Sequence, residues 1–196
     1  DSIDALEGAP LPVRKRTVSD LSDWLYPWTP VVPLVESVHD RVSVEIFRGC
    51  TRGCRFCQAG MVYRPVRERD DQRVAEWARE LVANTGCDEI SLTSLNSADY
   101  SRIHPLAERL SLEMERLHVA VSVPSLRTDS FSVQLASELR RVKRTGLTLA
   151  PEAGSARVRA AINKGVAEED LLRAISAAYG EGWRKIKLYF MVGLPG

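Results

Sequence analysis

The sequence predicts an α/β fold in which parallel β-strands alternate with α-helices. Two observations lead to this prediction. Five short apolar runs recur along the 196-residue chain, and segments with the apolar spacing of amphipathic helices lie between them. Units of this kind wind right-handedly into an open sheet or a barrel, and both architectures place the chemistry at the carboxyl ends of the strands.

The expected strands are the apolar runs 42–47, 89–95, 118–123, 147–150 and 185–192. Four helices are expected. The first covers 72–86 and the second begins at His104. The third includes Phe131, Leu135, Leu139 and Val142, and the fourth covers about 168–180. Gly86 is placed to end the first helix, and Pro105 suits the first turn of the second. In the fourth helix, the side chains expected to face inward are those of Leu171, Leu172, Ile175 and Tyr179.

Residues 1–40 are expected to form an extended connector packed on a core of residues 41–196. Prolines stand at positions 10, 12, 27, 30 and 33, and proline is excluded from helix interiors and central strands. Trp24, Tyr26 and Trp28 are too apolar for a free linker, so we expect them to pack on the core. The chain begins without methionine and ends just after an apolar run. We therefore expect a segment of a longer protein, truncated at the C-terminal end of the core.

Composition is that of a soluble globular protein, with 44% hydrophobic and 27% charged residues and a net charge of +1. This balance gives no sign of a nucleic-acid or membrane partner. No apolar run approaches the roughly 20 residues that span a bilayer. Four cysteines in a chain of this size do not make a disulfide scaffold, so we expect a reducing, cytoplasmic location.

Three of the cysteines stand together after the first expected strand, in RGCTRGCRFCQAG. Cys50, Cys54 and Cys57 have the spacing Cys-x3-Cys-x2-Cys. Thiolates are the usual ligands of iron–sulfur clusters, and a cubane of four irons requires four ligands. Three would leave one iron open to a substrate. The residues between them suit a bulky anionic cluster, because they include the small Gly49, Gly53 and Gly60 and the cationic Arg48, Arg52 and Arg55.

A structural zinc site is the alternative for these cysteines. It would need four ligands. His39 and Cys87 are the candidates for the fourth, but each precedes a strand and is expected at the opposite end of the sheet.

The stretch RGCTRGCRFCQAG resembles the cluster loop of the radical S-adenosylmethionine (radical SAM) superfamily, whose pattern is CxxxCxΦC with an aromatic Φ, here Phe56. The continuation QAGMVYRPVRER resembles an uncharacterised bacterial subfamily in which a cobalamin-binding-type domain precedes the radical SAM core. The resemblance covers about residues 34–196. It implies a partial parallel (βα) barrel of the radical SAM type, with about five of six βα units present and the sixth strand beyond Gly196.

The resemblance also implies the chemistry. Cys50, Cys54 and Cys57 would be the metal ligands of a [4Fe–4S] cluster, and the methionyl group of SAM would chelate the fourth iron. A one-electron reductant protein would reduce the cluster, which would cleave SAM to a 5′-deoxyadenosyl radical. Methyl or methylthio transfer is among the reactions that the resemblance implies, and RNA is among the substrates. Cobalamin would bind to the full-length protein. The rival functions are a zinc-stabilised binding module and a cluster-containing electron-transfer protein that does not cleave SAM.

Cofactor-binding residues are implied at the ends of the strands. Ser94, Leu95 and Asn96 occupy the place of a Gly-Gly-Glu stretch that binds the methionyl ammonium, Phe56 would flank the adenine, and Val192, Gly193 and Leu194 would form the adenine-binding turn. Both strand ends also have simpler interpretations, because TSLNSADY and GLPG are ordinary turn sequences.

Three further residues follow the third and fourth strands. Arg127 could bind the methionyl carboxylate, and a solvated surface arginine is the alternative. Glu152 could bind the ribose hydroxyls or the ammonium group. We favour this function because the sequence offers that acid no structural partner. Ser155 would open a helix whose N-terminal amides bind polar cofactor groups, or it is simply an N-cap.

Overall fold

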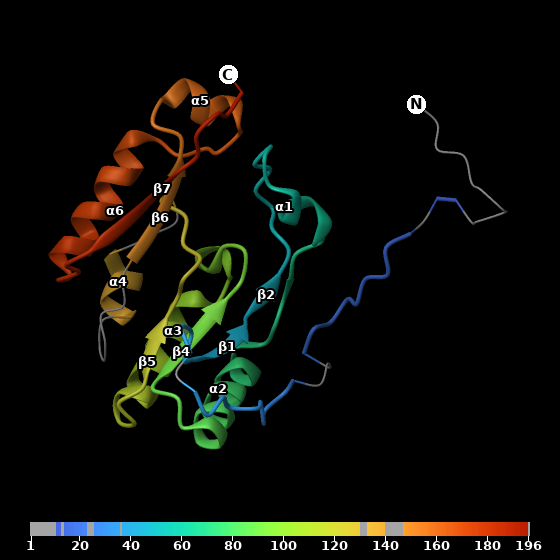
Figure 1. The fold of residues 1–196 in the computed structure, drawn as a ribbon, viewed down its shortest axis with the longest axis vertical. Coiled ribbons are helices and arrows are strands. Elements are labelled where there is room, and N and C mark those ends of the chain that lie inside the picture. The colour runs from blue at the N-terminus through green and yellow to red at the C-terminus, as the bar shows by residue number, and fades with distance from the viewer. Residues whose placement is uncertain are drawn as a thin grey trace.

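A computed structural model describes residues 11–12, 14–22, 26–35, 37–129, 133–139 and 147–195. Five of its strands lie in two parallel sheets (Figure 1). β1 (Val42–Glu45), β4 (Glu89–Thr93) and β5 (Ala120–Ser122) form one sheet in that order, and β6 (Leu147–Glu152) pairs with β7 (Ile186–Phe190) in another. Every pairing within these two sheets is parallel. The prediction of an α/β fold with five parallel strands is confirmed.

The remaining elements are short strands and helices. β2 (Phe47–Arg48) pairs antiparallel with β3 (Arg67–Glu68). The helices are α1 (Gln58–Val62), α2 (Asp71–Thr85), α3 (Ile103–Glu115), α4 (Val133–Leu139), α5 (Ala156–Ala161) and α6 (Glu168–Gly180), with a 3-10 turn η1 over Ser97–Asp99. Figure 1 shows α1 and α5 at the same end of the molecule. No helix in the described ranges is long and apolar enough to cross a membrane.

Helix α2 shows how local sequence sets the element boundaries. Asp70 caps its start, because the Asp70 carboxylate accepts hydrogen bonds from the backbone N–H groups of Gln72 and Arg73 at 3.0 and 3.1 Å. Gly86 ends it in the left-handed conformation, with φ of 71°. The expected helix over 72–86 is therefore confirmed to within one residue. The expected start of α3 is confirmed equally closely.

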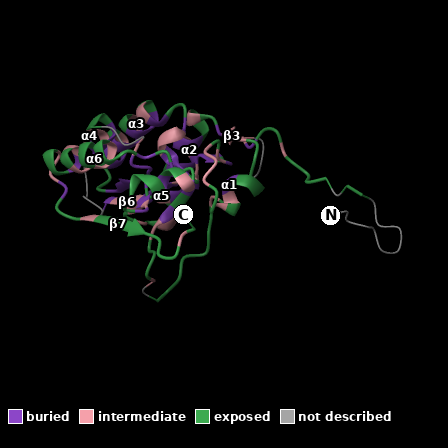
Figure 2. Cartoon of the chain, turned by 90° about the horizontal axis from the view of Figure 1, so that it is seen from above, coloured by how far each residue is buried: buried purple, intermediate pink, exposed green. Residues whose placement is uncertain are grey.

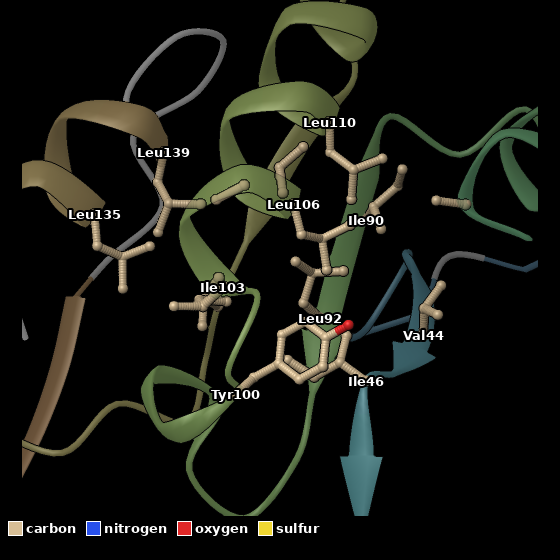
Figure 3. Packing of buried hydrophobic residues seen from close by; sticks show 14 of the residues in the cluster. Val44, Ile46, Ile90, Leu92, Tyr100, Ile103, Leu106, Leu110, Leu135 and Leu139 are labelled. Atoms are coloured by element: carbon tan, nitrogen blue, oxygen red, sulfur yellow. The ribbon is translucent and has the colours of Figure 1, made fainter. Parts of the chain in front are cut away.

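The hydrophobic core lies between the sheet and the helices that cover it. Figure 3 shows Val44, Ile90 and Leu92 from the strands facing Leu106 and Leu110 of α3. All five are fully buried, and burial of each side chain stabilises the fold by about 1.5–3 kcal/mol. Leu135 and Leu139 extend the same core to α4, as the sequence predicts, while Phe131 and Val142 lie outside the described residues.

The prediction for the inward face of α6 is wrong in part. Leu172 and Tyr179 are 58% and 53% exposed, whereas Ala174 and Ala178 are buried. The buried stripe begins at the half-buried Leu171 and follows the i, i+3, i+7 spacing through these alanines. The prediction placed the large apolar residues on the inward face. In the structure alanines occupy that face, because their small side chains let the helix pack closely.

The described part of residues 1–40 contains neither helix nor strand, and two of its aromatic residues pack on α2. The Tyr26 ring stacks on that of Trp77 with 4.8 Å between centroids, and its hydroxyl donates to the Ser43 carbonyl at 2.6 Å. Trp28 also contacts Trp77. Trp24 lies outside the described residues, and the division of the chain at residue 40 stays a prediction.

At the other edge of the molecule, β7 is largely exposed (Figure 2). Four consecutive residues of this strand, 187–190, are exposed to solvent.

Candidate functional site

The three clustered cysteines lie in a loop, residues 49–57, that connects β2 to α1. Gly49 starts the loop with φ of 98°, and a Cβ atom there would lie 2.7 Å from the Pro65 carbonyl oxygen and 2.8 Å from that of Tyr63. No other residue fits at this position without moving backbone. Arg64, which stands between Tyr63 and Pro65, also fixes the loop, because its Nε donates to the Cys50 carbonyl at 3.1 Å.

Each of the three cysteine sulfurs accepts one N–H hydrogen bond. The backbone N–H of Arg52 donates to Cys50 Sγ at 3.4 Å and that of Gly60 to Cys57 Sγ at 3.3 Å. A side-chain nitrogen, Arg127 Nη1, lies 3.4 Å from Cys54 Sγ. All three cysteines are unpaired and partly exposed. N–H donors aimed at sulfur stabilise thiolates and are typical of the surroundings of iron–sulfur ligands.

Gly60 lies beside two of the cysteines. A Cβ atom at Gly60 would lie 3.5 Å from Cys57 Sγ and 4.0 Å from Cys50 Cβ. The cysteine loop therefore fits an iron–sulfur cluster in its sulfur atoms and in the N–H groups that donate to them.

Neither candidate for the fourth ligand of a zinc site, His39 or Cys87, lies at the cysteine loop. No three His, Cys, Asp or Glu side chains in the described ranges stand close enough to hold one metal ion. His39 and Cys87 both line a cavity of about 310 Å³ between the connector and the starts of the strands, far from the cysteine loop, as expected. The ligands of a cubane cluster need not meet at one point, because each binds a different iron.

The turn that follows α5 clamps the cysteine loop. Arg55 N donates to the Ile162 carbonyl at 2.9 Å, and Asn163 Nδ2 donates to the Gly53 carbonyl at 2.8 Å. Asn163 has a left-handed backbone with φ of 55°. These contacts place the loop at the carboxyl ends of the strands, because α5 follows the end of β6.

A second attachment runs from the loop to the ends of β4 and β5. Both Nε and Nη2 of Arg52 donate to the Asp99 carboxylate, at 2.8 and 2.5 Å, and Nη1 donates to Asp129 at 3.3 Å. Burial alone would raise the pKa of Asp99, but the hydrogen bonds and charge of Arg52 outweigh it and hold that pKa below its usual value.

Arg127 is buried, so its interpretation as a solvated surface arginine is wrong. The residue is 8% exposed. Its Nε donates to Asp129 Oδ1 at 2.9 Å and its Nη2 to the Lys164 carbonyl at 2.5 Å. Its backbone N–H donates to Asn96 Oδ1 at 3.2 Å, and Asn96 is itself 1% exposed.

Glu152 has a partner, which corrects the reasoning from the sequence. Glu152 Oε1 accepts from Lys164 Nζ at 3.2 Å, and the two side chains are 15% and 6% exposed. Lys164 Nζ also lies 5.9 Å from the centre of the Phe56 ring. The Glu152 carbonyl accepts from Met191 N at 2.8 Å. Phe56, Glu152 and the start of the predicted adenine turn are therefore close together.

The other predicted residues lie in different surroundings. Ser94 and Leu95 line a cavity of about 420 Å³ beside the cysteine loop, together with Glu45, Phe47, Arg48, Gly49, Tyr63 and Thr93. Ser155 is an N-cap, since its Oγ accepts from Val158 N at 3.2 Å. In the predicted adenine turn, Val192 is 99% exposed, Leu194 is partly exposed and Gly193 has φ of 78°.

A family comparison agrees with this arrangement. The sequence model of the Radical SAM superfamily matches residues 44–196. The chain belongs to the radical SAM superfamily. An uncharacterized protein of Methanocaldococcus jannaschii is 40% identical over 152 residues, which are 78% of this chain and 33% of that protein. The chain thus spans about a third of the length of this curated relative.

Solved radical SAM structures share the fold. The methyltransferase TsrM from Kitasatospora setae gives a TM-score of 0.64 at 17% identity, over 80% of this chain and 31% of that one. The cobalamin-dependent radical enzyme OxsB gives 0.63 at 13% identity, over 76% and 23%. Methylornithine synthase gives 0.55 at 14% identity, over 79% and 45%. At these identities the likeness is one of fold, and it establishes the partial parallel barrel.

Within this radical SAM core, sequence reasoning missed Asp99, Asp129 and Lys164. Lys164 stands in the run AINKG, in which Asn163 and Gly165 both have positive φ. An Asn and a Gly flanking one residue signal a tight turn. The sequence therefore signals the turn, but it does not indicate the direction of the Lys164 side chain.

Proposed function

We propose that this chain is the core of a radical SAM enzyme in which Cys50, Cys54 and Cys57 ligate three irons of a [4Fe–4S] cluster. The observation that carries the proposal is the N–H donor at each of the three sulfurs, in a chain of this superfamily. The fourth iron would take the methionyl group of SAM. When bound and reduced, the cluster supplies the electron that cleaves SAM to a 5′-deoxyadenosyl radical.

The protein's own residues would position SAM. Glu152, fixed by Lys164, would accept hydrogen bonds from the ribose hydroxyls or the ammonium group. Phe56 would flank the adenine, and the turn of Val192, Gly193 and Leu194 would contact its edge. The cavity lined by Ser94 and Leu95 supports a place for the methionyl end, because it adjoins the cysteine loop. Asn96 and Ser155 have structural partners of their own, so their proposed role is indirect: they would hold the backbone near SAM without binding it.

The reaction outcome is left open by the fold. The solved neighbours include a methyltransferase and methylornithine synthase, and one fold supports many reactions. We therefore propose methyl or methylthio transfer as the class of reaction and RNA as one candidate substrate. Cobalamin would bind in the full-length protein. We also propose a one-electron reductant protein as partner and a reducing cytoplasm, which keeps the free cysteines available.

Anaerobic reconstitution of the purified chain with iron and sulfide tests the proposal. We expect a brown chromophore, the electron paramagnetic resonance (EPR) signal of a reduced [4Fe–4S] cluster, and 5′-deoxyadenosine after reduction with SAM. Cys50→Ala, Cys54→Ala and Cys57→Ala should each abolish cluster loading. Cys87→Ala is the matched control and should load normally, because Cys87 lies at the opposite end of the strands.

Two results would contradict the proposal in different ways. Tight stoichiometric zinc with no cluster would favour the zinc-stabilised binding module. A stable cluster that never yields 5′-deoxyadenosine in the presence of SAM would favour the electron-transfer protein.

A further inference from the structure

We propose that Arg127 is a positioning residue of the cluster, whose guanidinium donates to Cys54 Sγ and raises the reduction potential of the cluster that this sulfur ligates. The inference rests on the proposed function, since it requires a cluster bound through Cys54.

The contact between Arg127 and Cys54 differs from the other two sulfur contacts. Cys50 and Cys57 accept from backbone N–H groups of their own segment. Cys54 accepts from a side chain 73 positions later in the sequence, at the end of β5. The bond therefore forms only when the barrel brings that strand end to the cysteine loop.

The guanidinium of Arg127 is held in one orientation. Nε donates to Asp129 Oδ1 at 2.9 Å, and Nη2 donates both to Asp129 Oδ2 at 3.2 Å and to the Lys164 carbonyl at 2.5 Å. With these N–H groups engaged, Nη1 faces Cys54 Sγ at 3.4 Å. A fixed donor needs no reorganisation when charge builds up on the sulfur.

Burial makes the donor effective. Arg127 is 8% exposed, and charges interact more strongly where water is excluded. Asp129 offsets part of the Arg127 charge, but it also binds Arg52, which in turn binds Asp99. An N–H donor and a nearby cation both favour the more negative, reduced cluster. Removing them should therefore make the reduction potential more negative.

A role for Arg127 in binding the methionyl carboxylate makes a different prediction. To bind a second carboxylate with a forked pair of N–H groups, Arg127 would have to release Asp129 or Cys54. If that exchange occurs, substitutions of Arg127 weaken SAM binding and leave the potential measured without SAM unchanged.

Redox titration of the reconstituted protein, followed by absorbance and EPR in the absence of SAM, separates these roles. Arg127→Met keeps the bulk of the side chain and removes every donor. Arg127→Lys keeps the charge and loses the fork. Arg55→Met is the matched control, because Arg55 is exposed, neighbours Cys54 and directs its guanidinium to the Ala161 carbonyl. We expect a more negative potential in Arg127→Met, a smaller shift in Arg127→Lys, and a still smaller one in Arg55→Met.

The inference is overturned if Arg127→Met keeps the wild-type potential, or shifts it no more than Arg55→Met does. Should Arg127→Met fail to load a cluster, Arg127→Lys tests the same claim, because it keeps the charge and loses the fork that aims Nη1 at the sulfur. A wild-type potential in Arg127→Lys would then reject it. Failure of the wild-type chain to load a cluster through Cys54 would instead reject the proposed function.

Discussion

The buried pair of Glu152 and Lys164 gives a prediction whose size can be worked out from the structure. In Lys164→Met, the apolar stem remains and the charge that faces Glu152 is lost. Removing one partner of a buried ion pair costs about 3–5 kcal/mol, because the other charge is left uncompensated. Glu152 keeps 15% of its side chain exposed, so we expect a loss near the lower end, about 3 kcal/mol.

Urea and thermal unfolding of the apoprotein, both followed by circular dichroism, measure this loss. For a chain of this size a loss of 1 kcal/mol lowers the melting temperature by roughly 2–4 °C. The expected fall in Lys164→Met is therefore roughly 6–12 °C. Lys187→Met is the control. Because Lys187 is exposed on β7, its substitution should change stability by no more than about 0.5 kcal/mol.

A double-mutant cycle isolates the interaction itself. Glu152→Gln removes the negative charge, so the double variant should regain most of the stability that Lys164→Met loses. Additive losses would show that Lys164 acts by packing on Phe56 and not through Glu152. A loss below about 1 kcal/mol in Lys164→Met would refute the reasoning, since surface pairs alone contribute that little.

Three other predictions concern the surroundings of the cysteine loop. Gly49→Ala should prevent cluster loading, because its Cβ would lie 2.7 Å from the Pro65 carbonyl oxygen; normal iron content after reconstitution would contradict this. The lowered pKa of Asp99 means that its pair with Arg52 stabilises the fold above the ordinary pKa near 3.8, and that this stability is lost as the pH falls through the folded value. Asp99→Asn should therefore flatten the acid side of the stability–pH profile, and an unchanged profile would contradict it. Ser155→Ala should cost about 1 kcal/mol of stability as a lost N-cap while SAM affinity stays unchanged, and a large loss of affinity would return Ser155 to the SAM site.

The strands and the first two long helices could be predicted because their signals are local. Asp70 and Gly86 are the caps of α2, and the apolar runs of β1 and β4 are short, continuous segments. The position of the cysteine loop followed from one rule, that parallel strands present their chemistry at the carboxyl ends. The contact of the loop with the end of β6 through Asn163 agrees with that rule.

The pairs that build the site could not be predicted because their partners are far apart in sequence. Arg52 lies 47 residues from Asp99 and 77 from Asp129. No periodicity or spacing connects such residues, and each could equally be a solvated surface charge. For Arg127, the alternative of a solvated surface arginine is wrong, because the residue is buried. The partner of Glu152 escaped prediction for a different reason, because Lys164 is near in sequence but reaches Glu152 only through a turn with positive φ at Asn163.

These long-range contacts explain how a short motif becomes a site. The cysteine loop supplies two of its own N–H donors to sulfur, but its position depends on three other parts of the barrel. Asp99 holds Arg52 from the end of β4, Arg127 contacts Cys54 from the end of β5, and Asn163 holds Gly53 from the turn after α5. Because each contact comes from a different βα unit, a shift of any one strand end would move the loop relative to the residues proposed to bind SAM. In the proposed function, the barrel would therefore set the distance between cluster and SAM, while the motif would supply only the ligands.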